Sequence, residues 1–322
     1  MAPFARADVG KATFQLVSTL LLWLANTVAI LWSLNVSLWL TAALSCVQGG
    51  LFIRLFVLHH DCGHGSFFPS KRWNDRVGRF LGLLSLTPYR YWRRTHAIHH
   101  ATSGNLDRRE FGDITTLTVD EYLALPWWGR VGYRIYRNPL ALVLVGPSYQ
   151  FLLKHRLPLD APLSWRAEWA GVALQNLLLT GAVTGLWLGF GWQAVFFLVM
   201  QPIIVGGALG LWLFYVQHQF EDAYWERSES WDFETASLQG SSYLEMPAWL
   251  HWFTGNIGYH HIHHLASRIP NYRLRDCIES VPQLRDINRF TLWESLKLAK
   301  LNLWDEATGK LVSFREIRTA RA

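Results

Sequence analysis

The hydrophobic and polar positions of this 322-residue chain are sorted into two long uncharged runs and three charged segments. No Asp, Glu, Lys or Arg occurs in residues 12–53 or in residues 169–220. A helix needs about 20 apolar residues to cross the roughly 30 Å of hydrocarbon in a bilayer, so each run is long enough for two crossings. We therefore expect two helical hairpins, whose four spans cover residues 12–33, 37–57, 169–189 and 192–217.

Short breaks in hydrophobicity mark the two expected turns. The first lies at residues 33–37, where serine and asparagine interrupt the apolar run, and the second contains Gly189 and Gly191 beside aromatic residues that suit a membrane interface. Backbone groups in lipid must be hydrogen-bonded within their own segment, so helices are the expected spanning structures. The fold class is therefore an all-α integral membrane protein, a single domain over residues 1–322 with four transmembrane helices in two hairpins.

The charged segments predict the orientation in the membrane. Two hairpins place residues 1–11, 58–168 and 218–322 on one side, and Lys and Arg outnumber Asp and Glu in the middle segment. Because loops rich in Lys and Arg stay in the cytoplasm, we expect both termini there. Only 17% of all residues are charged, against about 25% in soluble domains. This excludes an ordinary soluble globule, a disordered chain and a nucleic-acid binder, despite a net charge of +6.

Shorter elements are expected at the membrane surface. The apolar stretches 80–89 and 140–153 are too short to span and are predicted to be interfacial or partly inserted. Thr118 and Glu121 fit a capping box, which predicts an interfacial helix running toward Trp127 and Trp128.

Nine of the histidines carry the candidate chemistry. They follow the expected spans in boxes spaced HxxxH, HxxHH and HxxHH, with one more at the end of the fourth span: His60, His64, His96, His99, His100, His218, His260, His263 and His264. Residues at i, i+3 and i+4 share a helix face, so each box offers two or three imidazoles to one centre. Neutral imidazole binds Zn, Cu, Fe or Ni, and nine ligands suit two ions at four or five each. The boxes predict a histidine-rich cytoplasmic cap.

The remaining histidines are interpreted differently. His59 lies about 100° around the helix from His60, which favours a bystander at the interface. His155 and His251 are isolated, as expected of surface or capping residues. His261 competes with His260 for the third box, and we favour His260 because it completes the HxxHH spacing.

The three boxes on one side of a four-span protein resemble those of the membrane fatty acid desaturases and related hydroxylases. The resemblance covers residues 12–300 and is closest to the bacterial and plant acyl-lipid branch, the branch of delta-12-like desaturases. It is carried by the sequences HDCGHGSFF at 60–68, the stretch from His96 through TTLTVDEY at 115–122, and HHLASRIPNY at 263–272. One departure is Phe214, where animal acyl-CoA relatives carry an asparagine that holds a metal-bound water. The second box also lacks the arginine common in plant members.

This resemblance implies two iron ions, with O2 as co-substrate, bound by the nine histidines given above. Ligand histidines usually donate their other N–H to a carboxylate or carbonyl, and the carboxylates near the boxes are candidates for that contact: Asp61, Asp107, Asp113, Glu221 and Asp222. No redox-cofactor motif or fused cytochrome domain is visible. Electrons are therefore expected from a separate protein, such as ferredoxin or a cytochrome b5-like donor.

The resulting hypothesis is an O2-dependent acyl desaturase in a bacterial cytoplasmic membrane, acting on a membrane lipid or acyl substrate. Its active site faces the cytoplasm. The arginines at 90, 93, 94, 108 and 109 are expected to contact lipid phosphates or an acidic donor. A hydroxylase, acetylenase or epoxygenase with the same boxes is the alternative within the enzyme class. A divalent-metal transporter is a distant one, because transporters place ionisable ligands near the bilayer midplane.

Overall fold

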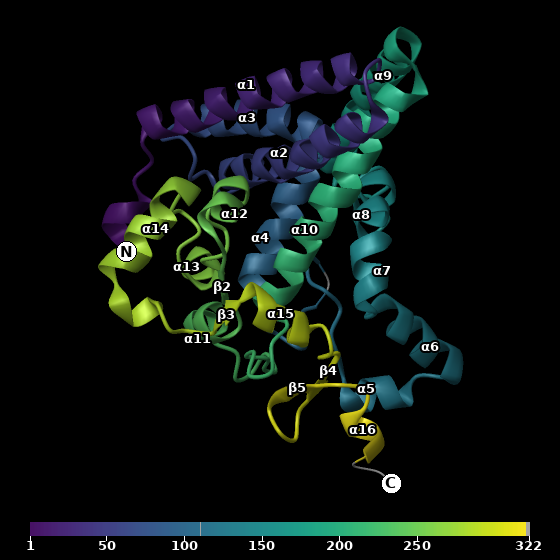
Figure 1. Cartoon of the computed structure of the whole chain (residues 1–322). Coiled ribbons are helices and arrows are strands. Elements are labelled where there is room, and N and C mark those ends of the chain that lie inside the picture. Colours follow the sequence, from purple (N-terminus) through teal and green to yellow (C-terminus); the bar gives the residue numbers. More distant parts are fainter. Residues whose placement is uncertain (110, 320–322) are drawn as a thin grey trace.

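The computed structural model describes residues 1–109 and 111–319, which form a mostly helical chain (Figure 1). The longer helices are α1 (Val9–Ser33), α2 (Leu38–His64), α3 (Lys71–Leu84), α4 (Tyr89–Thr102), α9 (Arg166–Val195) and α10 (Gln201–His218). The shorter α-helices are α5 (Val119–Ala124), α6 (Trp127–Tyr136), α7 (Pro139–Leu144), α8 (Gly146–Ser148), α11 (Phe233–Gln239), α12 (Ala248–Phe253), α13 (His260–Leu265), α14 (Asn271–Ser280), α15 (Leu292–Leu298) and α16 (Glu316–Thr319). Short 3-10 turns, η1 (Ala2–Ala5) and η4 (Pro282–Leu284), and π-helical segments, η2 (Tyr149–Lys154) and η3 (Phe196–Met200), lie between them.

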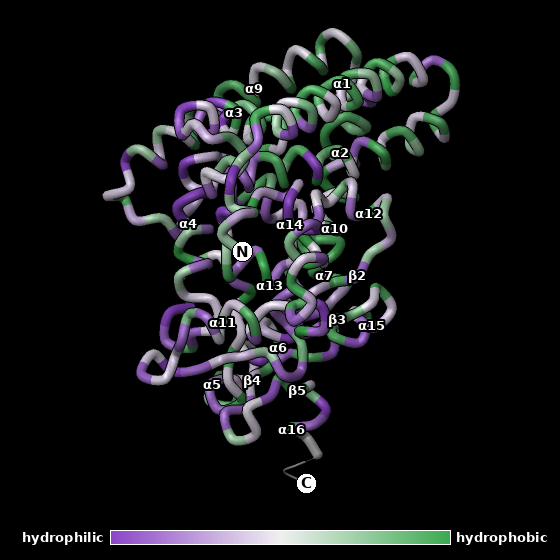
Figure 2. Tube along the Cα trace, turned by 90° about the vertical axis from the view of Figure 1, so that its left-hand side faces the viewer, coloured by the Kyte–Doolittle hydropathy of each residue, from purple (hydrophilic) through white to green (hydrophobic). Residues whose placement is uncertain are grey.

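Three helical stretches of the described chain are long and apolar enough to cross a membrane: Val9–Ser33, Leu38–His64 and Arg166–His218. Many apolar side chains of the first and third stretches face outward, with Phe14 74% exposed on α1 and Leu188 77% exposed on α9. Such a surface suits lipid rather than water, because soluble proteins rarely expose large contiguous apolar areas. The hydrophobic residues gather along α1, α2 and α9, whereas the end of the molecule around β5 and α16 is more polar (Figure 2).

The helix ends follow from local sequence. The Asp8 carboxylate accepts the Lys11 N–H at 2.9 Å and so caps α1, and the Ser37 hydroxyl oxygen accepts from the Leu40 N–H at 3.5 Å and so caps α2. Helix α2 ends at Gly65, whose φ of 69° is left-handed. It therefore extends seven residues beyond the expected end at residue 57, and the first histidine box lies within its last turns.

The third apolar stretch is interrupted at Gly191. The φ of 81° and ψ of 175° at this glycine are not helical, and a residue with a Cβ would not readily adopt them. The break falls inside the turn expected at residues 189–192. It divides the stretch into two arms, one from Arg166 to the break and one from the break to His218.

Close packing joins α2 to its neighbours. A Cβ on Gly206 of α10 would lie 2.4 Å from the carbonyl oxygen of Gly49 in α2, so the two backbones are nearly in contact. On the other side, the Asn26 amide of α1 donates to the Gln48 side-chain oxygen at 2.6 Å. These contacts hold α1, α2 and α10 together.

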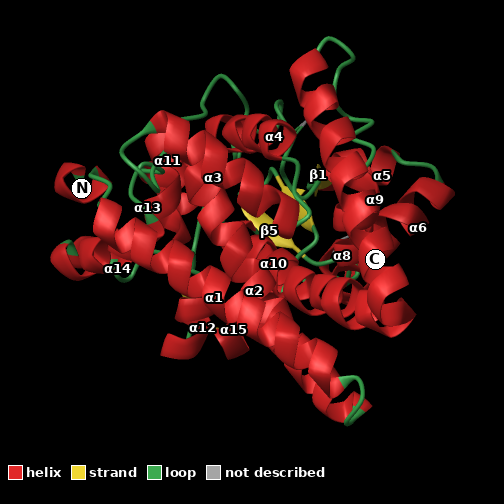
Figure 3. Ribbon diagram, turned by 90° about the horizontal axis from the view of Figure 1, so that it is seen from above, coloured by secondary structure: helices red, strands yellow, loops and turns green. Residues whose placement is uncertain are grey.

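Two small sheets lie in the polar part of the chain and correct the expectation of an all-α fold. Strand β4 (Leu303–Asp305) pairs in parallel with β1 (Leu117–Thr118) and antiparallel with β5 (Lys310–Val312), and β2 (Tyr243–Glu245) pairs in parallel with β3 (Arg289–Thr291). Strands β4 and β5 lie near α5 and α16, at the end of the molecule that carries the C-terminus (Figure 1), and in the view from above helices lie in front of β5 (Figure 3). Strands of two or three residues are too short to show the alternation on which a sequence-based prediction depends.

The expected interfacial pieces differ in detail from the prediction. The stretch 140–153 is divided into α7, α8 and η2, of which α7 and α8 pack against α10. The stretch 80–89 contains the end of α3 and the start of α4 rather than one element. The capping box of Thr118 and Glu121 is confirmed, and it opens α5 just before α6.

Candidate metal centre

Four helices bring the eight boxed histidines and His218 together. His60 and His64 lie in the last turns of α2, the second box lies in α4, His218 ends α10, and the third box lies in α13. The helices α2, α4, α10 and α13 converge on one region of the molecule (Figure 1). Residues 200 positions apart in the sequence thus share one centre.

The histidines form two groups that could each hold a metal ion. The five-histidine group contains His60, His64, His96, His100 and His263. The four-histidine group contains His99, His218, His260 and His264. Within each group the candidate ligand nitrogens all lie within 4.8 Å of one another.

Each HxxHH box is divided between the two groups, which corrects the expectation that a box serves one centre. In the second box His96 and His100 belong to the five-histidine group and His99 to the four-histidine group. In the third box the pattern is reversed, because His263 alone belongs to the five-histidine group. Adjacent residues on a helix are about 100° apart, so the two neighbouring histidines of each box face different ways.

The ring nitrogens face one another at distances that suit metal ligands. The Nε2 atoms of His218 and His260 are 2.9 Å apart, and those of His260 and His264 are 3.1 Å apart. In the other group the Nε2 atoms of His100 and His263 are 3.1 Å apart. Adjacent ligand nitrogens around an ion at about 2.1 Å would be separated by roughly 3 Å.

Burial keeps these imidazoles neutral. Burial, together with the neighbouring histidines, lowers the pKa of His96, His100, His260, His263 and His264 well below the ordinary value. A neutral ring offers a lone pair to a metal ion. Among the described residues, His64 Nε2 and His99 Nε2 are buried without a hydrogen-bond partner, as expected of nitrogens that bind a metal ion.

Two of the five candidate carboxylates contact a boxed histidine. Asp113 Oδ1 lies 2.5 Å from His99 Nδ1, and Asp61 Oδ1 lies 3.3 Å from His60 Nδ1. The Asp113 contact depends on Gly112, whose φ is 78° and where a Cβ would lie 2.8 Å from that of His99. Such partners orient a ligand ring and leave its other nitrogen free for the ion.

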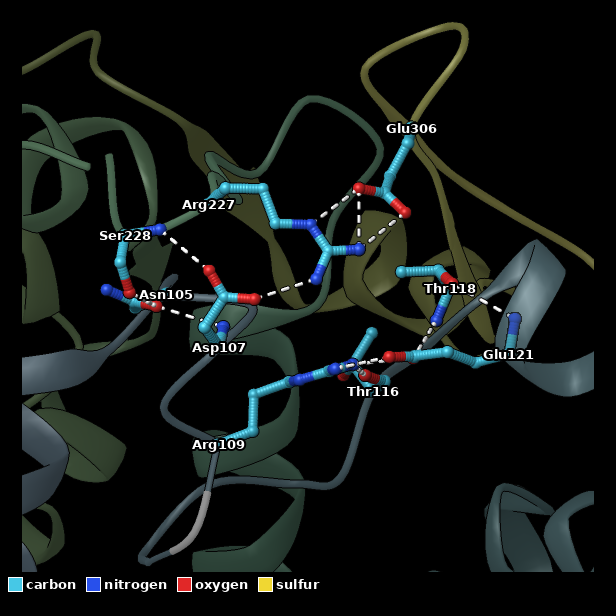
Figure 4. Close-up of polar contacts among 9 residues, drawn as sticks. All are labelled: Asn105, Asp107, Arg109, Thr116, Thr118, Glu121, Arg227, Ser228 and Glu306. Atoms are coloured by element: carbon cyan, nitrogen blue, oxygen red, sulfur yellow. Dashed lines mark hydrogen bonds and ion pairs between the residues drawn. The ribbon is translucent and has the colours of Figure 1, made fainter. Parts of the chain in front are cut away.

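The other three candidates lie elsewhere, which corrects the expectation that they support the ligands. Asp107 accepts from the Arg227 guanidinium at 2.8 Å and from the Ser228 N–H at 2.9 Å (Figure 4). Glu221 and Asp222 both pair with Lys310. These carboxylates are substantially exposed, so water solvates them, and their protein partners are basic side chains rather than ligand histidines.

The four other histidines lie outside both groups. His59 is buried in α2 with Nδ1 2.9 Å from the Gly78 carbonyl oxygen, rather than at the interface. His155 is buried too, with Nδ1 3.3 Å from the Leu86 carbonyl oxygen, so it is not a surface residue. His251 is half-exposed and its ring stacks on Tyr259, and His261 lies 2.9 Å from the Leu284 carbonyl oxygen.

Two further side chains contact the ligand rings and a third is buried nearby, and of these only Phe214 was singled out from the sequence, as a departure from the animal relatives. The Trp92 ring stacks on His96 with 4.4 Å between centroids, and Phe214 contacts the rings of His99 and His218. Arg137 is buried near the end of α10, where its guanidinium donates to the Tyr215 hydroxyl. Trp92 precedes His96 by one helical turn, so its spacing was a usable signal. The position of Arg137 had none, because its partners are distant in sequence.

The comparisons with known proteins agree with this centre. The sequence profile of the fatty acid desaturase family matches residues 37–290. The chain is 42% identical over 319 residues to a fatty acid desaturase of Bacillus subtilis, covering 99% of this chain and 90% of that protein. It is 30% identical to the sn-1 acyl-lipid omega-3 desaturase (ferredoxin) of Synechocystis, covering 77% of this chain and 70% of that protein. It is also 26% identical to the sn-1 oleoyl-lipid 12-desaturase of Anabaena variabilis, covering 83% and 77%.

These matches confirm the predicted resemblance and the enzyme class. The matched family and relatives are fatty acid desaturases, which are oxidoreductases, so the comparisons support the desaturase hypothesis. The chain belongs to the fatty acid desaturase family.

Proposed function

We propose that this desaturase acts on the acyl chains of membrane lipids. Two iron ions would be bound by the eight boxed histidines and His218, and a ferredoxin-type donor would supply the electrons. The observation that carries the proposal is the division of nine clustered imidazoles into groups of five and four, whose candidate ligand nitrogens lie within 4.8 Å of one another in each group. Such a pair of all-imidazole sites suits iron, and each leaves room in its coordination sphere for a small molecule. The acyl-lipid substrate follows from the relatives named for it.

The bound iron pair would supply the oxidising power to remove two hydrogens from adjacent methylenes, with O2 as co-substrate. The chain's own residues prepare the site for it. Asp113 fixes the ring of His99, and the Gly240 carbonyl oxygen, 3.1 Å from His218 Nδ1, fixes that of His218. With their Nδ1 atoms held in this way, both rings present Nε2 to the four-histidine group.

The membrane topology extends this proposal. A continuous helix of the 53 residues from Arg166 to His218 would be about 80 Å long, far more than a bilayer needs. The break at Gly191 supports two crossings there, and so four crossings in all, with the charged segments and both termini on the cytoplasmic side of a bacterial inner membrane. The histidines then lie at the cytoplasmic ends of α2 and α10, where an acyl chain leaving the bilayer reaches them.

Three of the five arginines that were expected to contact lipid phosphates or an acidic donor form ion pairs within the protein. Arg93 pairs with Asp75, Arg94 with Glu168, and Arg109 with Glu121, so these cations are partly neutralised. Ferredoxin is named as the donor of the Synechocystis relative, and a donor of that type is what we propose here.

The test is mass spectrometry of lipid-bound fatty acids from a bacterial host that expresses the chain together with a ferredoxin and its reductase. We expect a new unsaturated acid in the phospholipids, and its loss in the double variant His263→Ala, His264→Ala. The matched control, His251→Ala, alters a histidine outside both groups and should keep the product. A product that persists in the double variant would contradict the proposed metal ligands, and a new hydroxy or epoxy acid would favour the alternative chemistry.

A further inference from the structure

Arg137 is a buried and extensively hydrogen-bonded side chain that lies outside the histidine groups. It is 2% exposed and caps the C-terminal end of α6. Its guanidinium donates to five oxygens, at distances of 2.6–3.3 Å: the Thr115 carbonyl, the Thr116 hydroxyl, the Tyr215 hydroxyl, the Gln219 side-chain carbonyl and the Leu301 carbonyl. All five acceptors are neutral.

Four of these acceptors belong to two segments next to the four-histidine group, and the fifth, the Leu301 carbonyl, belongs to a third segment. Thr115 and Thr116 lie two and three residues after Asp113, whose carboxylate contacts His99. Tyr215 and Gln219 lie on either side of His218 at the end of α10. Thr116 and Gln219 are also bonded to each other at 3.2 Å. One guanidinium therefore fixes the position of the Asp113 segment relative to the end of α10.

Neighbouring residues of α6 strengthen the same connection. The Tyr136 hydroxyl accepts the Thr115 N–H at 3.0 Å, and the Tyr133 hydroxyl accepts the Leu117 N–H at 3.0 Å. Three residues within the last turn of α6 thus hold the segment that follows Asp113.

Stability alone does not account for a charge at this place. Arginine stays protonated, so its burial without a carboxylate requires many well-placed acceptors. Replacing buried charged groups by apolar side chains of similar volume is often neutral or stabilising. What an apolar residue would not supply is the fixed, directional link between three chain segments.

We infer that Arg137 is a positioning residue for the four-histidine group: through Thr115, Thr116 and Gln219 it sets the relative positions of His99 and His218. This inference rests on the proposed function, because it takes that group to be a metal site. It concerns one of the two groups, and this selectivity makes it testable without measuring desaturation.

The experiment compares the purified wild type with Arg137→Gln and Arg137→Lys, after reconstitution with iron in detergent. Iron per chain is measured by plasma mass spectrometry, and cobalt-loaded samples are titrated by their visible absorption. We expect about two ions in the wild type and about one in Arg137→Gln, with an intermediate value for Arg137→Lys, which restores the charge but not the planar fork. The matched control is Arg156→Gln, since Arg156 also donates to neutral oxygens, those of Leu86 and Asn176, but contacts neither histidine group.

The outcomes separate the inference from its basis. A wild type that binds fewer than two ions would contradict the proposed function itself. Two ions in Arg137→Gln, or loss of both ions in parallel with thermal unfolding, would overturn the positioning role. If Arg137→Gln does not fold, Gln219→Leu removes the nearest acceptor and keeps the guanidinium. It should lose the same single ion, and two ions retained in a folded Gln219→Leu would overturn the inference.

Discussion

The near-contact between α2 and α10 makes Gly206→Ala a sharp test of how the fold positions the metal centre. The added Cβ would lie 2.4 Å from the Gly49 carbonyl oxygen and 3.0 Å from Cδ1 of Phe52. A carbon normally approaches a carbonyl oxygen to about 3.3 Å, so the helices must separate by roughly 0.9 Å or distort. Forcing extra volume into a packed interface typically costs about 1–3 kcal/mol of unfolding free energy.

The displacement is also expected to reach the chemistry. Helix α2 carries His60 and His64 at its end and α10 carries His218, so moving one helix against the other shifts the two histidine groups relative to each other. A misplacement of about 1 Å can lower an enzymatic rate about 100-fold. We therefore expect Gly206→Ala to lose both thermal stability and most of its activity.

The assay is thermal unfolding in detergent, alongside fatty acid analysis of expressing cells. Gly210→Ala is the matched control, because it lies one turn further along α10 and a Cβ there meets no atom within 4 Å. Alanine favours the helix over glycine by up to about 1 kcal/mol, so the control should be as stable as the wild type or more so. Equal melting temperatures and activities for the two variants would refute the reasoning.

Two further predictions concern carboxylates. Asp113→Asn should weaken metal binding to the four-histidine group about 10–100-fold in a chelator competition, because it replaces the charged acceptor of His99 by a neutral amide, whereas Asp107→Asn should leave metal binding unchanged. The Arg109 guanidinium, together with a backbone N–H, lowers the pKa of Glu121, so its stabilising contribution is complete above the ordinary glutamate pKa and is lost as the pH falls through the lowered value. Unfolding of Glu121→Gln should therefore depend less on pH below about 4.5 than that of the wild type, and parallel curves would contradict this.

Hydrophobic periodicity, charge and residue spacing predicted those features of the fold that lie within a single segment. The helical spans, the break near Gly191 and the spacing of the histidine boxes all follow from patterns within a single segment. Long-range contacts leave no such trace. Asp107 and Asp113 are equally plausible from their distance to the second box, but only Asp113 follows a glycine that lets its segment approach α4. The parallel pairings of β1 with β4 and of β2 with β3 were missed for the related reason that they join residues far apart in the chain.

The division of each HxxHH box between the two groups depends both on the local spacing of the histidines and on long-range packing. The spacing places the three histidines on neighbouring faces of one helix, and the histidines of α2, α10 and α13 that each face of α4 meets decide which group it joins. In α4 the i, i+4 pair joins the five-histidine group, and in α13 the equivalent pair joins the four-histidine group. Each of these helices therefore contributes to both groups, which ties the spacing between the two sites to rigid helical geometry. That is a reason for a spacing of three and four residues beyond the number of ligands it supplies: a box spaced only HxxxH places its pair on one side, as in α2, and cannot connect two sites.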